Sequence, residues 1–209
     1  MYHPPILLFL SLLFTLPLFL TSTRAQESLQ VACGSDGEIL HNSTLAGLSG
    51  EHDIKTTLRT CPGFANKSAN SSVSRGLTAP TKKRDFVQCT PLDCAEVVCA
   101  NFTYHQPQIA DCEYLTKAVM NLGNITVPMT SLYQVTFNTC SFEFANEDQE
   151  DYIVCWLDFT LNSLTSAERC FGNYPSACST AGAQCRQSVP ENTYFWRLQI
   201  VYPYSGPGT

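Results

Sequence analysis

The sequence has little charge and no excess of positive charge. Charged residues make up 14% of the chain, with 12 Lys and Arg against 18 Asp and Glu, whereas an average protein carries roughly 25%. A nucleic-acid-binding protein needs a basic face, so this composition argues against that class. The chain also lacks a G-x-S-x-G motif and has four histidines. These features leave few candidates for an activated nucleophile and its base.

Cysteine, in contrast, is abundant, with 11 in 209 residues. Disulfides form in oxidising compartments, whereas cytosolic thiols stay reduced. The spacings are longer than the C-x2-4-C pairs of zinc sites, so the sequence predicts disulfides and neither a metal site nor a cofactor. Complete pairing leaves one cysteine over, and the connectivity cannot be deduced from the sequence. The disulfide candidates are Cys33, Cys61, Cys89, Cys94, Cys99, Cys112, Cys140, Cys155, Cys170, Cys178 and Cys185.

The beginning of the chain is typical of a secretory signal peptide. Ile6 to Leu20 is almost uniformly apolar, and small residues follow at Thr23 and Ala25. This pattern predicts a signal peptide over residues 1–25 with cleavage after Ala25. The apolar run has 15 residues, which is short of the ~20 that a spanning helix needs. We therefore expect a secreted, extracellular protein without a membrane span.

Five asparagines precede x-Ser or x-Thr without an intervening proline. Each motif is a weak signal alone, but in an exported chain the set predicts some N-glycosylation. The candidates are Asn42, Asn66, Asn70, Asn101 and Asn124.

The chain after residue 25 divides into two parts of different charge. Residues 26–84 hold seven basic and five acidic residues, and residues 85–209 hold four basic and 13 acidic residues. Residues 67–81 are rich in Ser, Ala and Thr, which predicts a linker. The linker ends in Lys82-Lys83-Arg84. This basic run is either a processing site, which would make 26–84 a pro-segment removed after Arg84, or a solvated basic loop.

Residues 85–209 have the pattern of a compact cysteine-rich α+β domain. Apolar residues recur at helical spacing over Ala110 to Leu122, with Asp111 as a candidate cap and Gly123 after the end. Leu132 to Phe144 and Tyr152 to Leu161 are rich in strand-forming residues and are separated by a charged turn. The two segments predict a hairpin.

Two further elements complete the predicted domain. Thr165 to Glu168 has the form of a capping box and predicts the start of a short helix. Tyr194 to Tyr202 alternates as a strand, with Trp196, Leu198 and Ile200 inward and Arg197 and Gln199 outward. Antiparallel strands with helices packed on one side make an α/β sandwich, which disulfides would stabilise. In the N-terminal half, Cys33 can pair with Cys61, or Cys61 can bond to the later half. Across the predicted hairpin, Cys140 lies near-opposite Cys155, so a bridge between them is possible, and Cys112 could equally pair with either.

One ordered set of features runs through this domain. It consists of Asp111-Cys112-x-x-Leu115, Thr139-Cys140-Ser141-Phe142, Ala167-x-x-Cys170 and Trp196-x-Leu198-x-Ile200. This order resembles the small secreted fungal proteins related to the extracellular-protein-two necrosis effectors and the smut-virus killer toxins. The resemblance covers roughly residues 85–204 and implies an α/β sandwich that acts outside the cell by binding. Killer toxins are thought to block ion channels through basic residues, and this domain departs from them in having four basic residues.

Candidate site residues are few. Glu143 and Asp158, on the two strands of the predicted hairpin, are the best carboxylate pair for glycosidase chemistry, and His105 is the one histidine of the second half. We rank catalysis below binding, since nothing predicts that these groups converge. Tyr152 and Trp156 share a strand face that is either covered by the fold or exposed as a stacking platform for a sugar or a protein.

Together these features predict a secreted, cysteine-rich glycoprotein that acts as an effector-like or toxin-like binding protein. The expected partner is an extracellular protein or a cell-wall glycan. The alternatives are a small secreted hydrolase acting on carbohydrate and a structural cell-wall glycoprotein.

Overall fold

The computed structural model describes residues 27–48, 50, 53–68, 89–90, 92–174, 177–186 and 195–203. The predicted signal peptide with its cleavage after Ala25, most of the predicted linker, and the basic run ending at Arg84 lie outside these residues.

Seven strands form one antiparallel sheet in the order β1-β2-β5-β6-β9-β8-β3. Two further strands, β4 and β7, pair with each other. The strands are β1 Ile39–Ala46, β2 Asp53–Thr60, β3 Glu96–Cys99, β4 Asn124–Val127, β5 Ser131–Phe137, β6 Cys140–Asn146, β7 Tyr152–Cys155, β8 Gly182–Arg186 and β9 Trp196–Val201.

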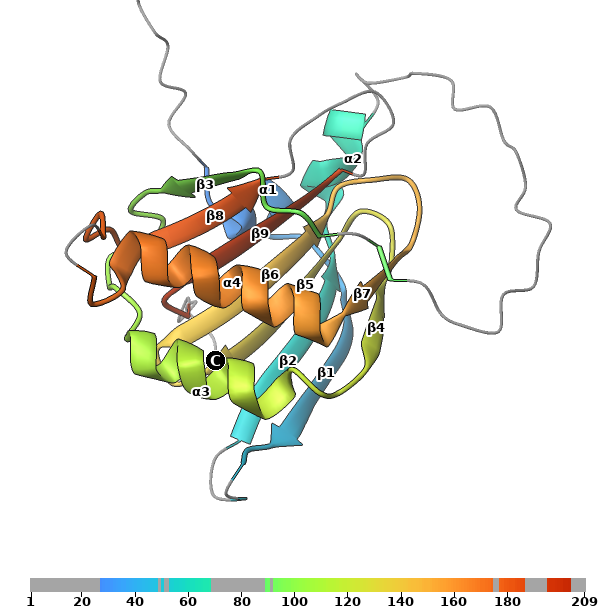
Figure 1. Ribbon diagram of the computed structural model, residues 1–209. Helices are drawn as coiled ribbons and strands as arrows, with labels where there is room; N and C mark the ends of the chain where they lie inside the picture. Colours follow the sequence, from blue (N-terminus) through green and yellow to red (C-terminus); the bar gives the residue numbers. More distant parts are fainter. Residues whose placement is uncertain are drawn as a thin grey trace, which may run out of the picture.

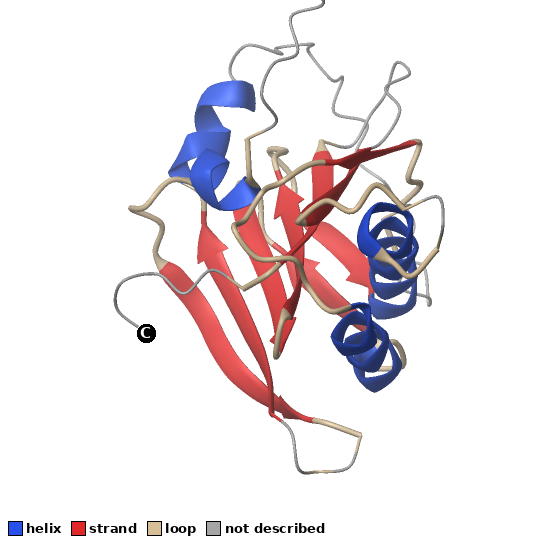
Figure 2. Cartoon of the chain, turned by 90° about the vertical axis from the view of Figure 1, so that its left-hand side faces the viewer, coloured by secondary structure: helices blue, strands red, loops and turns tan. Residues whose placement is uncertain are grey.

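Helices pack on both faces of this sheet (Figures 1 and 2). The longer helices, α3 (Ile109–Val119) and α4 (Trp156–Phe171), lie side by side on one face. The short helices, α1 (Leu29–Cys33) and α2 (Pro62–Ser68), pack against the other. The predicted α+β class with stabilising disulfides is confirmed. Helices were expected on one side of the sheet, and the two short helices form an additional layer on the other side.

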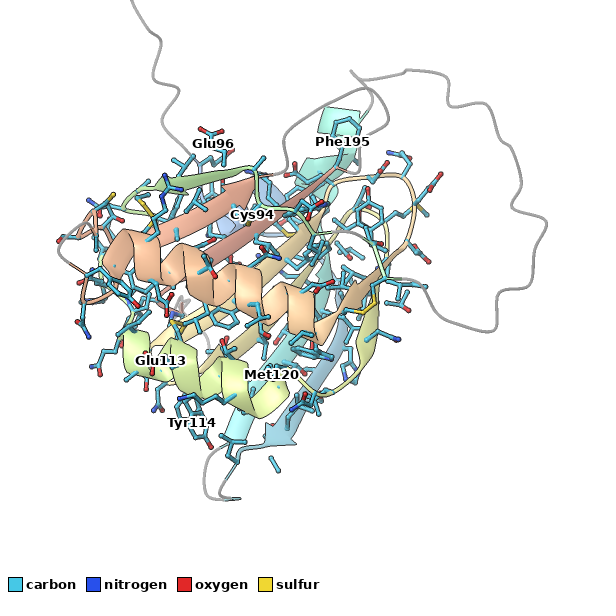
Figure 3. All side chains as sticks on the ribbon, in the orientation of Figure 1. Cys94, Glu96, Glu113, Tyr114, Met120 and Phe195 are labelled. Carbon is cyan, nitrogen blue, oxygen red and sulfur yellow. A yellow bond between two sulfur atoms is a disulfide. The ribbon has the colours of Figure 1, made fainter. Side chains whose placement is uncertain are left out.

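The N-terminal segment belongs to the same sheet as the rest of the chain. β1 and β2 form a hairpin, and β2 pairs with β5 from Lys55↔Thr136 to Thr60↔Ser131. At the far end of the hairpin, the Leu48 amide donates to the Tyr114 hydroxyl of α3 at 2.9 Å. Figure 3 shows Tyr114 projecting from α3 toward the hairpin. The segment before the basic run is therefore an integral part of this fold.

The face beneath α3 and α4 is apolar and aromatic. Alternate residues of β6 point to it, and Phe142 and Phe144 meet the ring of Phe159 from α4 edge-on, each at 6.2 Å between centroids. Trp196, Leu198 and Ile200 of β9 are buried in the same core, which confirms their predicted inward orientation.

The predicted hairpin is wrong in its boundaries. The expected single strand Leu132 to Phe144 is two strands, β5 and β6, which reverse at Asn138-Thr139. Asn138 adopts a positive φ of 46°, which asparagine tolerates better than most residues because its short polar side chain can bond locally. The carboxylate of Asp111 accepts hydrogen bonds from Thr139 and Asn138. Asp111 therefore fixes this turn from the first turn of α3, where it was expected to act as a cap.

The second predicted strand is also wrong, since it ends at Cys155 and the chain continues as α4. The expected capping box at Thr165 to Glu168 is the interior of that helix. The apolar stripe of α4 is interrupted by buried hydroxyl residues, which hid the helical period. Thr160, Ser163 and Ser166 donate to the carbonyl oxygens four residues earlier, at 2.8 Å each. These bonds satisfy the hydroxyls inside the core.

Five disulfides connect these layers, and Cys178 is an exposed free cysteine. The pairing of Cys33 with Cys61 agrees with the prediction. Of the two partners left open for Cys140, the structure has Cys112, and Cys155 pairs with Cys89 because Cys140 and Cys155 do not face each other across a hairpin. The remaining pairs are Cys94–Cys185 and Cys99–Cys170. Within the described ranges, no helix has the length and apolar character needed to cross a membrane.

Candidate functional site

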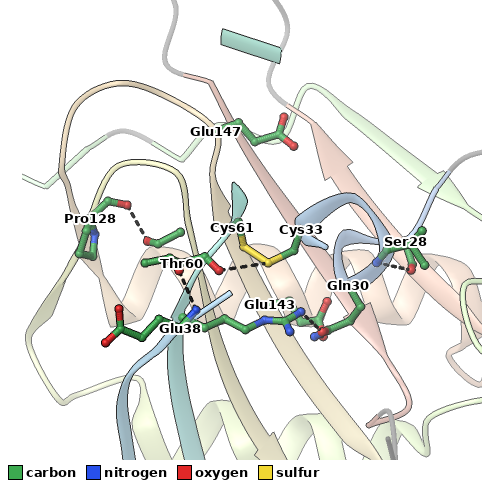
Figure 4. Close-up of a disulfide and its surroundings, with 12 residues drawn as sticks. Ser28, Gln30, Cys33, Glu38, Thr60, Cys61, Pro128, Glu143 and Glu147 are labelled. Carbon is green, nitrogen blue, oxygen red and sulfur yellow. Dashed lines mark hydrogen bonds between the residues drawn. A yellow bond between two sulfur atoms is a disulfide. The ribbon is translucent and has the colours of Figure 1, made fainter. Parts of the chain in front are cut away.

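Helix α1 covers a polar patch on the sheet face opposite α3 and α4. The helix begins after Ser28, whose hydroxyl accepts from the Val31 amide at 3.4 Å, and ends at Gly34, which has a positive φ of 89°. Its disulfide from Cys33 to Cys61 fixes it next to the end of β2 (Figure 4). The Ser28 cap, the turn at Gly34 and the disulfide stabilise a helix of five residues. A helix of this length would be too short to form alone.

Glu143 lies at the centre of the covered patch. Its side chain is fully buried, and it points away from the aromatic core because strand side chains alternate between faces. Oε1 accepts from Gln30 Nε2 at 2.6 Å and from Gln134 Nε2 at 3.2 Å, and Oε2 accepts from Gln199 Nε2 at 3.2 Å. Figure 4 shows Gln30 reaching from α1 toward Glu143. A buried carboxylate without such donors would be strongly destabilising.

The polar network extends in both directions from Glu143. The Oε1 of Gln199 accepts from the Leu29 amide at 3.0 Å and from Gln184 at 3.2 Å, so α1 is also bonded to the sheet through its backbone. On the other side, the Arg59 guanidinium donates to Gln30 Oε1. Gln30 therefore links the negatively charged Glu143 to the positively charged Arg59.

Burial changes the acidity of both charged groups. Burial raises the pKa of Glu143 to about 7, against the opposing effects of the Gln30 bond, the Arg59 charge and the Gln199 bond. Burial also lowers the pKa of Arg59, although the charge of Glu143 works in the opposite direction. Glu143 therefore changes its charge near neutral pH, whereas an arginine stays cationic. The net charge of the network is positive when Glu143 is protonated.

A pocket of about 430 Å³ opens beside this network. This volume lies in the range of small-molecule sites, which are mostly apolar with a few polar groups. Gln30, Arg59 and Gln199 provide amide and guanidinium groups beside three hydroxyl residues, whereas Val31, Phe102 and Val201 provide apolar walls. Ser28, Gly34, Ser35 and Thr103 complete it. The pocket joins residues from α1, β2, β9 and the loop after β3.

The arrangement is suited to binding. Glu143 is fully buried. Its carboxylate accepts hydrogen bonds from the side-chain amides of Gln30, Gln134 and Gln199. A general acid or base must come within hydrogen-bond reach of the group it serves. Arg59, in contrast, lines the pocket directly and can present donors to a ligand.

The predicted catalytic candidates are not brought together. Glu143 faces α1, whereas Asp158 is exposed in the first turn of α4 on the opposite side of the sheet. His105 is exposed and lies against Tyr202, with 5.2 Å between ring centroids. In the described part of the chain, no group of three His, Cys, Asp or Glu residues is placed to hold a metal ion.

Tyr152 and Trp156 do not form an exposed platform. They are 2% and 3% exposed, respectively, and belong to the core beneath the helices. Trp156 contacts the ring of Tyr133 edge-on at 5.7 Å, and Tyr152 donates from its hydroxyl to Asp148. The sequence left open whether these side chains are covered by the fold or exposed as a stacking platform. In the structure they are covered.

The glycosylation candidates fall on different parts of the surface. Asn42 is exposed on the edge strand β1, Asn124 is exposed at the start of β4, and Asn101 is exposed in the loop after β3. Asn66 lies in α2, and Asn70 lies outside the described residues.

Sequence reasoning singled out none of the residues that line the pocket as a site. Gln199 was expected to face outward, and this was wrong, because α1 covers that side of β9. Gln30 and Arg59 lie in a segment interpreted as separable from the domain. The sequence did contain a signal that this segment joins the sheet. The run from Asp53 to Thr60 is rich in β-branched residues, which favour a strand. Comparison of the chain with protein-family models, with curated proteins and with solved structures finds no match.

Proposed function

We propose that this chain is an exported binding protein that acts outside the cell, in an effector-like or toxin-like role, and carries out no reaction itself. The observation that carries the proposal is the pocket beside α1, in which Arg59 and two glutamines meet apolar walls. Such a lining fits recognition of a ligand. The candidate catalytic groups Glu143, Asp158 and His105 lie apart.

Export is supported by the signal-like N-terminus and by the disulfide framework. Ten of the cysteines pair and one is exposed and free. Intact mass of material recovered from the culture medium should reveal five disulfides and one thiol open to alkylation. Recovery of the chain inside the cell with most of its thiols reduced would overturn the proposal.

Cleavage after Arg84 stays part of the proposal and now has a structural consequence. Every disulfide joins residues on the same side of Arg84, so none would tie the two products together. The pairing of β2 with β5 and the packing of α1 would still hold them. N-terminal sequencing of cut protein should find Asp85 together with the start of the first product. The two products should co-purify in native buffer and separate in denaturant without reductant.

A turnover assay distinguishes binding from hydrolysis. Purified secreted protein should release no product from chromogenic glycosides or esters. Turnover that disappears in Glu143→Gln or Asp158→Asn would replace the binding proposal with a hydrolase. Retention of the protein in the wall fraction, with glycans on Asn42, Asn101 and Asn124, would favour a structural glycoprotein.

A further inference from the structure

We infer that the pocket beside α1 takes a small organic carboxylate with an apolar body, and that Arg59 binds its carboxylate group. This inference rests on the proposed binding function and names the ligand class of that site. The geometry of Arg59, the apolar walls and the buried counter-charge each contribute to it.

Arg59 provides the anion-binding group. A guanidinium has five N–H donors in a planar fork, a geometry that matches a carboxylate. Among the described residues, the hydrogen bond from the Arg59 side chain goes to Gln30, through Nη2. Arg59 also lines the pocket, and we assign its remaining N–H groups to the ligand. A half-buried guanidinium interacts with an anion more strongly than an exposed one, since water screens it less.

The apolar walls select the body of the ligand. Val31, Phe102 and Val201 supply apolar walls of the pocket, and their side chains offer no hydrogen bonds. A polyol such as a sugar would leave several hydroxyls without partners against these walls, which is costly. An aromatic or aliphatic body would bury apolar surface there and gain free energy.

The carboxylate of Glu143 is the counter-charge of Arg59. Its negative charge depends on pH, because the pKa of Glu143 is raised to about 7. The elements around Glu143 present amides to it, namely Gln30 from α1, Gln134 from β5 and Gln199 from β9. Arg59 is the charged side chain that acts on it. Next to the lining residue Ser35, Asp36 accepts from the Ser35 hydroxyl at 2.8 Å, but Asp36 is exposed and water screens its charge. Protonation of Glu143 therefore leaves Arg59 without its internal counter-charge.

This pairing predicts that an anionic ligand binds better in acid. Below neutral pH, the ligand carboxylate would supply the negative charge that Glu143 lacks. Above neutral pH, the ionised Glu143 competes with the ligand for Arg59. A neutral ligand of the same shape should respond much less to pH.

The test uses phenylacetate, its neutral analogue phenylacetamide, and the acidic sugar D-glucuronate, with calorimetric or NMR titration of the intact protein. At pH 5.5, phenylacetate should bind about tenfold more tightly than phenylacetamide, which is the usual gain of a charge-assisted hydrogen bond. Its affinity should fall several-fold at pH 8, and Glu143→Gln should abolish this fall. Stronger binding of glucuronate than of phenylacetate would overturn the apolar-body assignment.

Two variants test the site and the guanidinium separately. Val31 lines the pocket and is 66% exposed, so Val31→Trp should obstruct the pocket without disturbing the core. Leu48→Trp is its matched control, since Leu48 is 59% exposed and does not line the pocket. Phenylacetate binding should be lost in the first variant and unchanged in the second. Binding that survives Val31→Trp overturns the site.

Arg59→Gln should remove the preference for phenylacetate over phenylacetamide, and a preference that persists would overturn the role of Arg59. If Arg59→Gln does not fold, Arg59→Lys, which keeps the charge but loses the fork, should weaken phenylacetate binding. Failure of all three probes to bind would overturn the ligand class, whereas the localisation, disulfide and turnover measurements would still decide the proposed function independently.

Discussion

The two faces of the seven-stranded sheet are stabilised by different chemistry. Beneath α3 and α4, successive aromatic rings such as Phe142, Phe144 and Phe159 pack edge to face. Beneath α1, the same strands present amides and one buried carboxylate, Glu143, together with a single small apolar cluster. One face therefore gains stability from apolar burial, and the other gains orientation from hydrogen bonds. A change of residue should have different consequences on the two sides.

The largest expected effect is on the aromatic face. Phe159→Ala should lower the free energy of unfolding by about 3–5 kcal/mol, because it removes a fully buried ring and leaves a cavity. Denaturant unfolding of the purified protein measures this change. Leu157→Ala, at a neighbouring exposed position of the same helix, should change it by less than about 0.5 kcal/mol. Similar losses in both variants would mean that the ring is not part of a well-packed core.

Two disulfides of equal sequence separation compare the faces directly. Cys33–Cys61 lies on the α1 face and Cys112–Cys140 on the aromatic face, and each spans 28 residues. Replacing either pair by alanines should cost about 3.5 kcal/mol, since the entropy of the closed loop is similar. Removing Cys33–Cys61 should also free α1, and hydrogen exchange at the Leu29 amide reports this directly.

The control for that experiment is the Cys112 and Cys140 double variant, in which the Leu29 amide should stay protected. If both double variants keep Leu29 protected, the polar network alone holds α1, and the disulfide is not needed for the site.

Stability should depend on pH through Glu143. Its pKa is 4.5 in a model peptide and about 7 in the folded protein. The folded state therefore binds an extra proton between these values, and the stability this gives is present below about pH 4.5 and lost as the pH rises through about 7. Raising the pH from about 5 to about 8 should lower the free energy of unfolding by about 2–3 kcal/mol through this group.

Glu143→Gln separates this effect from other titrations. The variant should have a flatter stability profile over the same pH range in urea unfolding. An unchanged slope would assign the pH dependence to other groups and would remove the link between Glu143 and the charge of the pocket.

The sequence predicted the aromatic face better than the polar one, for physical reasons. Trp196, Leu198 and Ile200 alternate cleanly, and a buried face leaves that period in the sequence. Gln199 alternates with them and so resembles a solvent-facing residue. The element that covers it begins at Leu29, 170 positions earlier. A contact between such distant segments leaves no local pattern at either end.

The sequence also failed to predict the first part of α4 as a helix. Thr160, Ser163 and Ser166 occupy buried positions of the helix and bond to its own backbone. Because hydroxyl residues interrupt the apolar stripe, the β-prone residues from Ile153 to Phe159 gave the stronger local signal. The tertiary packing of Phe159 and its neighbours overrides that preference.

The smallest expected effect tests how the hairpin of β1 and β2 is attached to the aromatic side. Tyr114→Phe removes the hydroxyl that accepts from the Leu48 amide at 2.9 Å, while keeping the ring that stacks on Phe137 at 4.3 Å. The unfolding free energy should fall by about 0.5–1 kcal/mol, because the bond from the Leu48 amide, at a partly exposed site, is lost. Hydrogen exchange should increase at Leu48 and leave the amide of Leu29 unaffected. Faster exchange at both amides would show that the hairpin and α1 open as one unit, and the two faces would then not be independent.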